Sequence, residues 1–238
     1  MTTQLIASNT RGKADFGWLN ANFSFSFGNY FNPNRVQFGM LRVLNDDTIA
    51  GGTGFGTHGH ANMEIITIPL EGGLQHRDRI GNESVIRFGD VQVMSAGSGV
   101  EHSEMNASKE ERAKTLQLWV FPDRENATPR YDQKSFDIEN QINTFVNIVS
   151  PNDMNDGNAL WVYQKTFFHL GIFENNTTTN YSVRIPKNGV YLFLIEGEIR
   201  INDQVLKARD AMEITDFENF EIKIITKSKI LLVEVPMN

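Results

Sequence analysis

The sequence predicts an all-β protein built from two β-barrels in tandem, and two features of the chain favour strands throughout. Short segments rich in Val, Ile, Phe and Thr recur along the 238 residues, separated by Gly, Asn and Asp turns such as Gly72-Gly73 and Gly81-Asn82. No stretch of about fifteen residues shows the 3.6-residue apolar period of an amphipathic helix.

A weak internal repeat predicts that there are two barrels. The Glu-Gly pair at 71–72 recurs at 196–197, and the Asp that follows it, Asp90, recurs as Asp210. Two copies of one strand–turn–strand plan, roughly 120 positions apart, are typical of tandem domains of one architecture. The segment 122–158 between them is rich in Asn, Asp, Pro and Gln, so we place one barrel in residues 1–140 and the other in 141–238.

Composition excludes several kinds of site and partner. The chain has a formal net charge of −7 and no basic run, so we expect no direct contact with nucleic acid. It has no cysteine, which excludes disulfides, iron–sulfur clusters and thiol nucleophiles and leaves His and carboxylates as metal ligands. We see no secretory signal in the first ten residues and no apolar run long enough for a membrane, so we expect a cytoplasmic protein.

Two short motifs carry the chemistry: His58-Gly59-His60 and His102-Ser103-Glu104. Residues i and i+2 of a strand face the same side, so each motif presents two ligands together. If the two strands are neighbours in a barrel, three imidazoles and a carboxylate surround one point. That set suits one divalent transition-metal ion: Fe(II), Ni, Mn, Co, Cu or Zn. An octahedral ion with four protein ligands keeps two positions for water, dioxygen or substrate.

The flanks of these motifs, Gly52-x5-His58-x-His60-x3-Glu64-x7-Gly72 and Gly89-x5-Ser95-x-Gly97-x4-His102-x3-Asn106, closely resemble the two cupin motifs. The whole chain resembles the pirin family, and especially the bacterial pirin-like proteins described as quercetin 2,3-dioxygenases. The segments that carry this resemblance are Thr10-Arg11-Gly12, Phe25-Ser26-Phe27-Gly28-Asn29-Tyr30, Gly54-Phe55-Gly56-Thr57-His58-Gly59-His60, Asn62-Met63-Glu64-Ile65-Ile66-Thr67, His76-Arg77-Asp78, Gly81-Asn82, Ser95-Ala96-Gly97-Ser98-Gly99-Val100-Glu101-His102-Ser103-Glu104 and Thr128-Pro129-Arg130-Tyr131. The match is dense in the N-terminal half and looser in the C-terminal half.

The resemblance implies a bicupin, two jelly-roll barrels of cupin type, with His58, His60, His102 and Glu104 around one ion that is usually iron. The chain departs from the family at two places beside the ligands. Gly59 stands where proline is common, and Ala61 stands where a basic residue often follows the second histidine. Glycine loosens the backbone there, so metal affinity is expected to be lower, but neither change removes a ligand.

Glu64 is an alternative carboxylate ligand. It shares the even parity of His58 and His60, and ordinary cupins use the glutamate at this position. Pirin-like sequences instead use the carboxylate two residues after the third histidine, so the resemblance favours Glu104. Glu64 then has an outer-sphere or proton-handling role, or is a buried acid paired with Arg77 or a histidine.

Other residues leave alternatives open. His76 is expected to be an ordinary polar strand residue, with a role in orienting a ligand as the alternative. Phe23, Phe25 and Phe27 alternate, so we expect all three on one strand face, either in the core or as a stacking wall for an aromatic substrate. The second half of the chain contains one histidine, His169, and cannot build a comparable site.

The resemblance implies an Fe(II)-type dioxygenase that opens a flavonol such as quercetin with O2. The metal would bind the hydroxyl and carbonyl oxygens of this aromatic small molecule, and Glu104 or Glu64 would accept the hydroxyl proton. The alternative, also implied by the family, is a non-enzymatic metal-dependent redox sensor or transcriptional co-regulator that acts through a regulatory protein partner. A metal-free barrel with a vestigial site is disfavoured by the four intact ligand positions.

Overall fold

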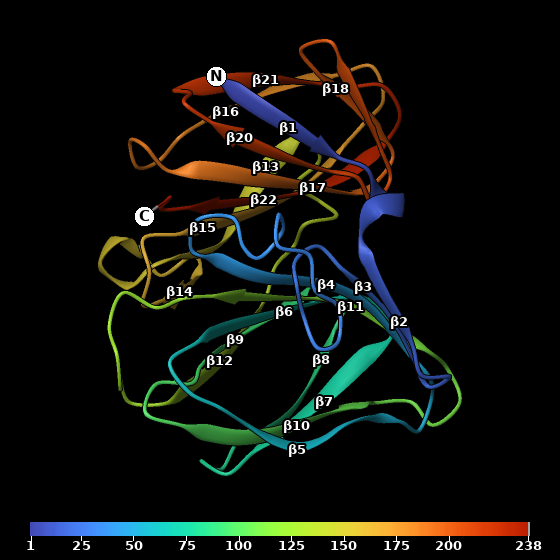
Figure 1. Cartoon of the computed structure of the whole chain (residues 1–238), viewed down its shortest axis with the longest axis vertical. Helices are drawn as coiled ribbons and strands as arrows, with labels where there is room; N and C mark the ends of the chain where they lie inside the picture. Colours follow the sequence, from blue (N-terminus) through green and yellow to red (C-terminus); the bar gives the residue numbers. More distant parts are fainter. Residues whose placement is uncertain (238) are drawn as a thin grey trace.

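The structure, a computed structural model, describes residues 1–237 and consists almost wholly of β-strands. Two lobes are stacked along the long axis of the molecule (Figure 1). The first lobe contains β2 (Gly12–Asp15), β3 (Leu19–Phe23), β4 (Leu41–Ile49), β5 (Gly54–His60), β6 (Glu64–Glu71), β7 (Gly73–Asp78), β8 (Glu83–Arg87), β9 (Asp90–Ser95), β10 (Val100–Asn106), β11 (Ala113–Val120) and β12 (Arg130–Ser135).

The second lobe contains β1 (Thr2–Ile6), β13 (Thr144–Pro151), β14 (Leu160–Val162), β15 (Phe167–Phe173), β16 (Thr178–Ser182), β17 (Gly189–Glu196), β18 (Glu198–Ile201), β19 (Gln204–Lys207), β20 (Ala211–Thr215), β21 (Asn219–Ile224) and β22 (Ser228–Val235). Two short 3-10 segments, η1 (Ser8–Thr10) and η2 (Asn152–Met154), complete the secondary structure of the described residues. None of the helical segments within residues 1–237 combines the length and hydropathy of a transmembrane span.

Each lobe is a barrel made of a seven-stranded and a four-stranded sheet. In the first lobe the sheets have the orders β12-β9-β6-β11-β4-β3-β2 and β5-β10-β7-β8. In the second lobe the orders are β1-β20-β17-β22-β15-β13-β14 and β16-β21-β18-β19. The predicted all-β fold with two similar barrels is confirmed.

The first strand of the chain lies in the sheet of the second lobe, which the sequence did not indicate. β1 pairs antiparallel with β20 from Thr2↔Thr215 to Ile6↔Ala211, and the blue strand lies among orange and red ones in Figure 1. Farther along the chain, β12 pairs with β9 of the first lobe, and β13 pairs with β15 of the second. The division at residues 140 and 141 stays a prediction, with β1 crossing from one lobe to the other.

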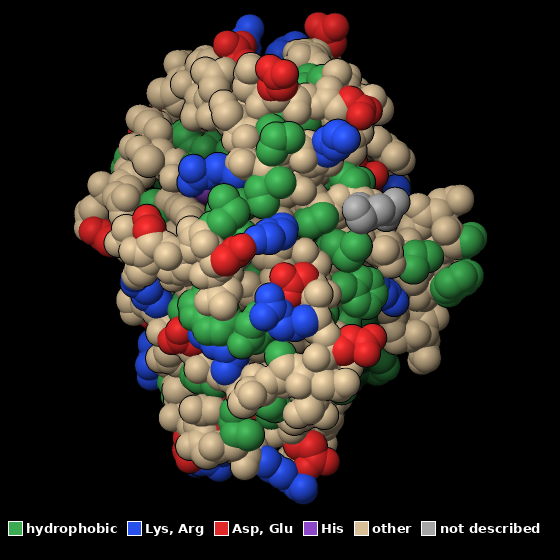
Figure 2. Space-filling view, turned by 90° about the vertical axis from the view of Figure 1, so that its left-hand side faces the viewer, with side chains coloured by type: hydrophobic (Ala, Val, Ile, Leu, Met, Phe, Trp, Pro, Cys, Tyr) green, Lys and Arg blue, Asp and Glu red, His purple; other side chains and the backbone are tan. Residues whose placement is uncertain are grey.

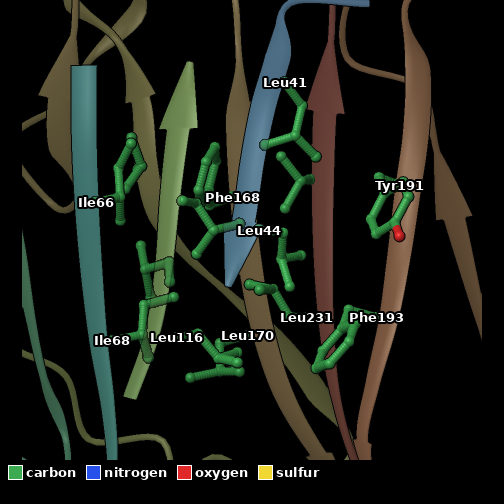
Figure 3. Close-up of a cluster of buried hydrophobic side chains, with 14 of the residues drawn as sticks. Leu41, Leu44, Ile66, Ile68, Leu116, Phe168, Leu170, Tyr191, Phe193 and Leu231 are labelled. Atoms are coloured by element: carbon green, nitrogen blue, oxygen red, sulfur yellow. The ribbon is translucent and has the colours of Figure 1, made fainter. Parts of the chain in front are cut away.

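The two seven-stranded sheets pack against each other through one apolar core. In the first lobe it is formed by residues that include Leu41, Leu44, Ile66, Ile68 and Leu116, and in the second by residues that include Phe168, Leu170, Tyr191, Phe193 and Leu231. Figure 3 shows these side chains filling the space between the strands of the two sheets. We call this contact the inter-sheet core.

The central strand β17 of the second lobe is apolar on both faces. In β17, Tyr191 and Phe193 enter the inter-sheet core, while Leu192 and Leu194 fill the interior of their own barrel. Successive side chains of a strand point to opposite faces, so a strand buried on both faces reads as a continuous apolar run. The second barrel is therefore solidly packed.

The first lobe uses the same plan with a polar inner face. In β11, Leu116 and Leu118 enter the inter-sheet core. The alternate residues Thr115, Gln117 and Trp119 therefore face the interior of the first barrel. This polar interior holds the candidate site.

The surface turned toward the viewer in Figure 2 has mixed charge. Lys and Arg side chains are interspersed with Asp and Glu side chains, and no continuous basic area is visible on this face. The face therefore presents no extended basic surface, and the expectation about nucleic acid stays a prediction.

Candidate metal centre and its cavity

Three of the predicted ligands converge in the first barrel. His58 and His60 lie on β5 and His102 lies opposite His58 on the neighbouring strand β10. The ring centroids are 4.8 Å apart for His58 and His60, 4.5 Å for His58 and His102, and 5.0 Å for His60 and His102. One nitrogen from each ring lies within 4.8 Å of the other two. Strand parity and strand pairing thus bring the three imidazoles together as predicted.

Glu104 follows His102 on β10 after a shift in register between these two residues and β5. Its carboxylate lies within 4.8 Å of ligand nitrogens of His102 and His76, and it does not belong to the group formed by His58 and His60. Glu104 nevertheless lines the same cavity as those two histidines. The structure therefore places it next to the three-histidine cluster, on the side of His102.

Hydrogen bonds leave one ring nitrogen free on two of the histidines. His58 Nδ1 lies 2.8 Å from the carbonyl oxygen of Gly56, so this nitrogen carries the proton and Nε2 has a lone pair. His102 Nδ1 lies 3.5 Å from His76 Nδ1, and His102 Nε2 is buried with no hydrogen-bond partner among residues 1–237. A buried polar atom without a partner is costly, and a metal ion among the three rings would provide one. The donor set fits a divalent transition metal.

Burial keeps the imidazoles of His60 and His102 neutral. Desolvation, reinforced by neighbouring His58, lowers the pKa of His60 to about 4 and that of His102 to about 3. Metal ions bind the neutral form of imidazole, so both rings are ready to act as ligands well below neutral pH.

His76 packs behind His102 and is fully buried. Its Nε2 lies 3.0 Å from Asp78 Oδ2, and its ring stacks on Tyr131 at 4.4 Å. If His76 donates from Nε2 to Asp78, its Nδ1 accepts a hydrogen bond from His102 Nδ1–H and leaves the free Nε2 of His102 for the cluster. The structure therefore favours the alternative in which His76 orients a ligand over an ordinary polar strand residue.

Asp78 is itself held by several donors. Burial alone would raise its pKa, but hydrogen bonds from His76 and Asn82 lower the pKa overall. Oδ1 accepts from the backbone N–H groups of Ile80 and Asn82, and Oδ2 accepts from the Asn82 side chain. The chain Asp78–His76–His102 is thus fixed from the turn between β7 and β8.

Glu104 is positioned from the opposite wall of the barrel. Gln117 Nε2 donates to Glu104 Oε2 at 2.6 Å, and Thr67 Oγ1 lies 3.4 Å from Oε1. Gln117 in turn accepts from Trp119 Nε1 at 3.1 Å. These are inward-facing polar residues of β6 and β11, and together they hold a carboxylate that is 2% exposed.

Glu64 lies elsewhere. It belongs to neither group of metal-ligating side chains, and it is absent from the lining of the cavity beside the histidines. Its Oε2 accepts from Ser95 Oγ at 2.7 Å, whereas Arg77 pairs with Glu83. Because Ile66 of the same strand enters the inter-sheet core, Glu64 faces that side, and Thr67 faces Glu104. The structure does not bring Glu64 to the predicted site.

A largely apolar cavity of about 660 Å³ opens beside the histidines. Its aromatic lining consists of Phe16, Trp18, Phe23, Phe27, Tyr30, Phe55 and Trp119. Polar side chains also line it: Lys13, Asn29, Asn45, Asp47, His58, His60, Glu104 and Gln117. Trp119 meets His60 edge to face at 4.9 Å, so the aromatic wall and the candidate metal position adjoin.

The expectation that Phe23, Phe25 and Phe27 share one face is wrong for Phe25. Phe23 and Phe27 line the cavity, whereas Phe25 packs on Tyr191 in the inter-sheet core. The reason is that β3 ends at Phe23, and the chain bends before the bridge between Phe27 and Tyr30. Alternation holds only within a strand, so parity does not carry across this bend.

The second barrel has a different polar cluster. His169 is buried, its Nδ1 lies 3.4 Å from Tyr181 Oη, and Tyr181 donates to Glu234 Oε2 at 2.7 Å. Glu234 also accepts from the backbone N–H groups of Arg184 and Ile185. Among residues 1–237, both groups of possible metal ligands lie in the first barrel. His169 is therefore a hydrogen-bonded core histidine.

Sequence reasoning missed Asp78, Thr67 and Gln117. Asp78 was detectable, because it lies two residues after His76 and so shares its face. Gln117 was also detectable as a polar residue in alternation within the apolar strand Thr115-Leu116-Gln117-Leu118-Trp119. Thr67 gave no signal, since threonine is common in strands.

Glu64 should make the stability of the protein depend on pH. Burial, partly offset by the hydrogen bond from Ser95, raises its pKa from 4.5 to about 7. The stabilisation of the protonated folded form is fully present below pH 4.5 and is lost as the pH rises through 7. Glu64→Gln has no carboxyl group to titrate at this position. The difference between its free energy of unfolding and that of the unsubstituted protein should therefore increase by roughly 3 kcal/mol, in favour of the variant, from pH 4 to pH 8. Urea unfolding across this range measures it, and a difference independent of pH would contradict the assignment.

Each half of the chain matches the model of a known protein family. Residues 6–120 match the family model of pirin, and residues 147–235 match that of the quercetinase C-terminal cupin domain. A quercetin 2,3-dioxygenase of Escherichia coli K12 is 37% identical over 232 residues, which cover 98% of each chain. A putative quercetin 2,3-dioxygenase of Pseudomonas aeruginosa is 38% identical over 224 residues, covering 94% of this chain and 95% of that protein.

Solved structures of a bacterial pirin are similar to this chain along nearly its whole length. The crystal structure of YhhW from Escherichia coli is 36% identical and superposes with a TM-score of 0.93, covering 99% of this chain and 98% of that one. The structure of the same bacterial pirin in complex with nickel(II) gives a TM-score of 0.92 over 99% of both chains. With its two cupin barrels and relatives of this similarity along nearly its whole length, the chain belongs to the pirin family.

Proposed function

We propose that this protein binds one divalent transition-metal ion through His58, His60, His102 and Glu104, and that the loaded protein is a dioxygenase of flavonols such as quercetin. Iron(II) is the proposed native ion. The observation that carries the proposal is the convergence of three imidazoles at the wall of an aromatic cavity. A relative bound to nickel(II) and relatives described as quercetin 2,3-dioxygenases support it.

Glu104 is the better carboxylate for this set. It lines the cavity and lies within 4.8 Å of His102, while Glu64 is directed to Ser95 on the other face of its strand. Gln117 and Thr67 hold Glu104 in place and leave it facing the cavity. Of the two glutamates predicted to be catalytic, Glu104 alone is therefore proposed to act on substrate.

The residues around the cavity suit a flat aromatic substrate. Its volume of about 660 Å³ lies within the range of small-molecule sites, and Phe23, Phe27 and Trp119 can hold aromatic rings and exclude water. A bound divalent metal would supply Lewis acidity for the oxygen atoms of the substrate and a position for dioxygen. Glu104 would accept the proton of the hydroxyl group at that end of the substrate, since its carboxylate lies within 4.8 Å of His102 and Glu104 lines the cavity.

Metal content tests the ligand set. Purified protein should contain about one transition-metal ion per chain, and the His58→Ala, His102→Ala double variant should lose it while keeping the fold. Glu104→Ala should lower metal content more than Glu64→Ala, which serves as the matched control because Glu64 lies outside the cluster. Elemental analysis measures the content and circular dichroism the fold. Full occupancy in the double histidine variant would sink the assignment.

Oxygen uptake tests the reaction. Protein loaded with iron(II) should consume O2 when given quercetin, and the flavonol absorbance should disappear at the same rate. The apo-protein and His60→Ala should do neither, while His169→Gln, in the second barrel, should retain activity. The redox-sensor alternative predicts metal binding without turnover. If no flavonol is consumed with Fe, Ni, Mn, Co or Cu, the dioxygenase proposal is wrong and the metal site stands.

A further inference from the structure

The cavity contains a second polar position that the histidines do not use. Asn45 and Asp47 lie on β4, two residues apart, and both line the cavity. They are 3% and 5% exposed, and the Oδ1 atom of each is buried without a hydrogen-bond partner among residues 1–237. Buried polar atoms are nearly always paired, so two unpaired oxygens side by side in one cavity call for an explanation.

The residues opposite Asn45 do not supply the missing donor in this structure. Asn45 lies opposite Phe23 on one neighbouring strand and Gln117 on the other. Phe23 has no polar group, and the Gln117 amide is directed to Glu104. The Oδ1 atom of Asn45 is therefore left without a donor from either opposite residue.

Asp47 is in the same situation. It lies opposite Ala21 and Thr115 on its two neighbouring strands. Ala21 has no polar side chain, and the Thr115 hydroxyl is directed to the backbone carbonyl oxygens of Ile68 and Leu116. The charged neighbour Asp46 points to the other face of β4, where it pairs with Arg11 and Arg209. Within residues 1–237 Asp47 forms no ion pair and its Oδ1 has no partner, although Lys13 also lines the cavity.

We propose that Asn45 and Asp47 form a specificity-determining acceptor site for a hydroxyl group of an aromatic ligand other than the oxygen atoms proposed to face the metal. The proposal rests on the proposed function and adds to it a substrate class: aromatic compounds that carry a hydroxyl group besides those at the metal. One end of the ligand lies at His58 and His60, and its rings lie against Phe23, Phe27 and Trp119. A further hydroxyl group donates to Asp47 or Asn45, on the part of the cavity wall next to Gln117. A polar site built to bind a hydroxyl rejects an analogue that lacks it, because the protein groups are then left unpaired.

Direct binding of two flavonols tests this site. Quercetin carries hydroxyl groups on both outer parts of the molecule, whereas 3-hydroxyflavone keeps the hydroxyl and carbonyl oxygens proposed to face the metal and lacks the others. Calorimetric titration of the metal-loaded protein without oxygen gives the two dissociation constants with no turnover. The unsubstituted protein should prefer quercetin, and Asn45→Leu and Asp47→Leu, which are similar in shape but apolar, should each reduce that preference roughly tenfold.

Two further variants separate a binding role from a structural one. Asp47→Asn keeps an acceptor oxygen and should retain most of the preference. Thr48→Val changes the next residue of β4, which faces away from the cavity, and should leave the preference unchanged. In the ligand-free protein, Asp47→Leu should raise the melting temperature, since it removes an unpaired buried group. A residue with a purely structural role would lower it.

Two results would overturn the proposal and can be told apart. If the protein binds both flavonols and the leucine variants leave their ratio unchanged, the acceptor site is wrong and the proposed function stands. If the metal-loaded protein binds neither flavonol, the acceptor site and the proposed function both fail.

Discussion

The inter-sheet core is the constraint on which the rest of this structure depends. Burying a Leu, Ile or Phe side chain contributes roughly 1.5–3 kcal/mol, and this core combines such residues from both seven-stranded sheets. Because side chains of a strand alternate, fixing Leu116 and Leu118 in the core also fixes Gln117 and Trp119 inside the first barrel. A slip of one residue would exchange the two faces, so the apolar contact sets the register that builds the site.

The two barrels differ in what their interiors contain. The second has a large apolar cluster, with residues such as Leu192 and Ile230, and it offers the first barrel an apolar face. The first holds, around its cavity and histidine cluster, polar atoms whose partners the fold does not supply: His102 Nε2, Asn45 Oδ1 and Asp47 Oδ1. Burial raises the pKa of Asp47 to about 8, reinforced by Asp46 and Glu104. Such unpaired groups destabilise a fold and cluster where ligands bind.

Much of this arrangement could be predicted from the sequence, because local periodicity determined it. The parity of His58 and His60, and of His102 and Glu104, needs only the geometry of a strand, and the repeat of the Glu-Gly pair indicated two barrels. Parity failed where strands end or where the face of a strand was unknown. Phe25 follows the end of β3.

Glu64 shares its parity with the histidines but lies on another strand. To know whether residues of two strands face the same side, one must know how the strands pair. The sequence of a single strand does not contain that information. For the same reason the pairing of β1 with β20 could not be predicted: a five-residue strand carries no sign of a partner more than two hundred residues away. The unpaired state of Asn45 and Asp47 depends on neighbours in four strands, so it becomes visible only in three dimensions.

The central claim is that the inner face of the first barrel assembles a metal centre from β5 and β10. Anomalous X-ray diffraction from crystals of the nickel(II)-loaded protein, collected at the nickel edge, tests it most directly. The account predicts one anomalous peak in each chain, within coordination distance of His58, His60 and His102 and of the Glu104 carboxylate. A peak beside Glu64 and Ser95 instead, or at His169 in the second barrel, would contradict it.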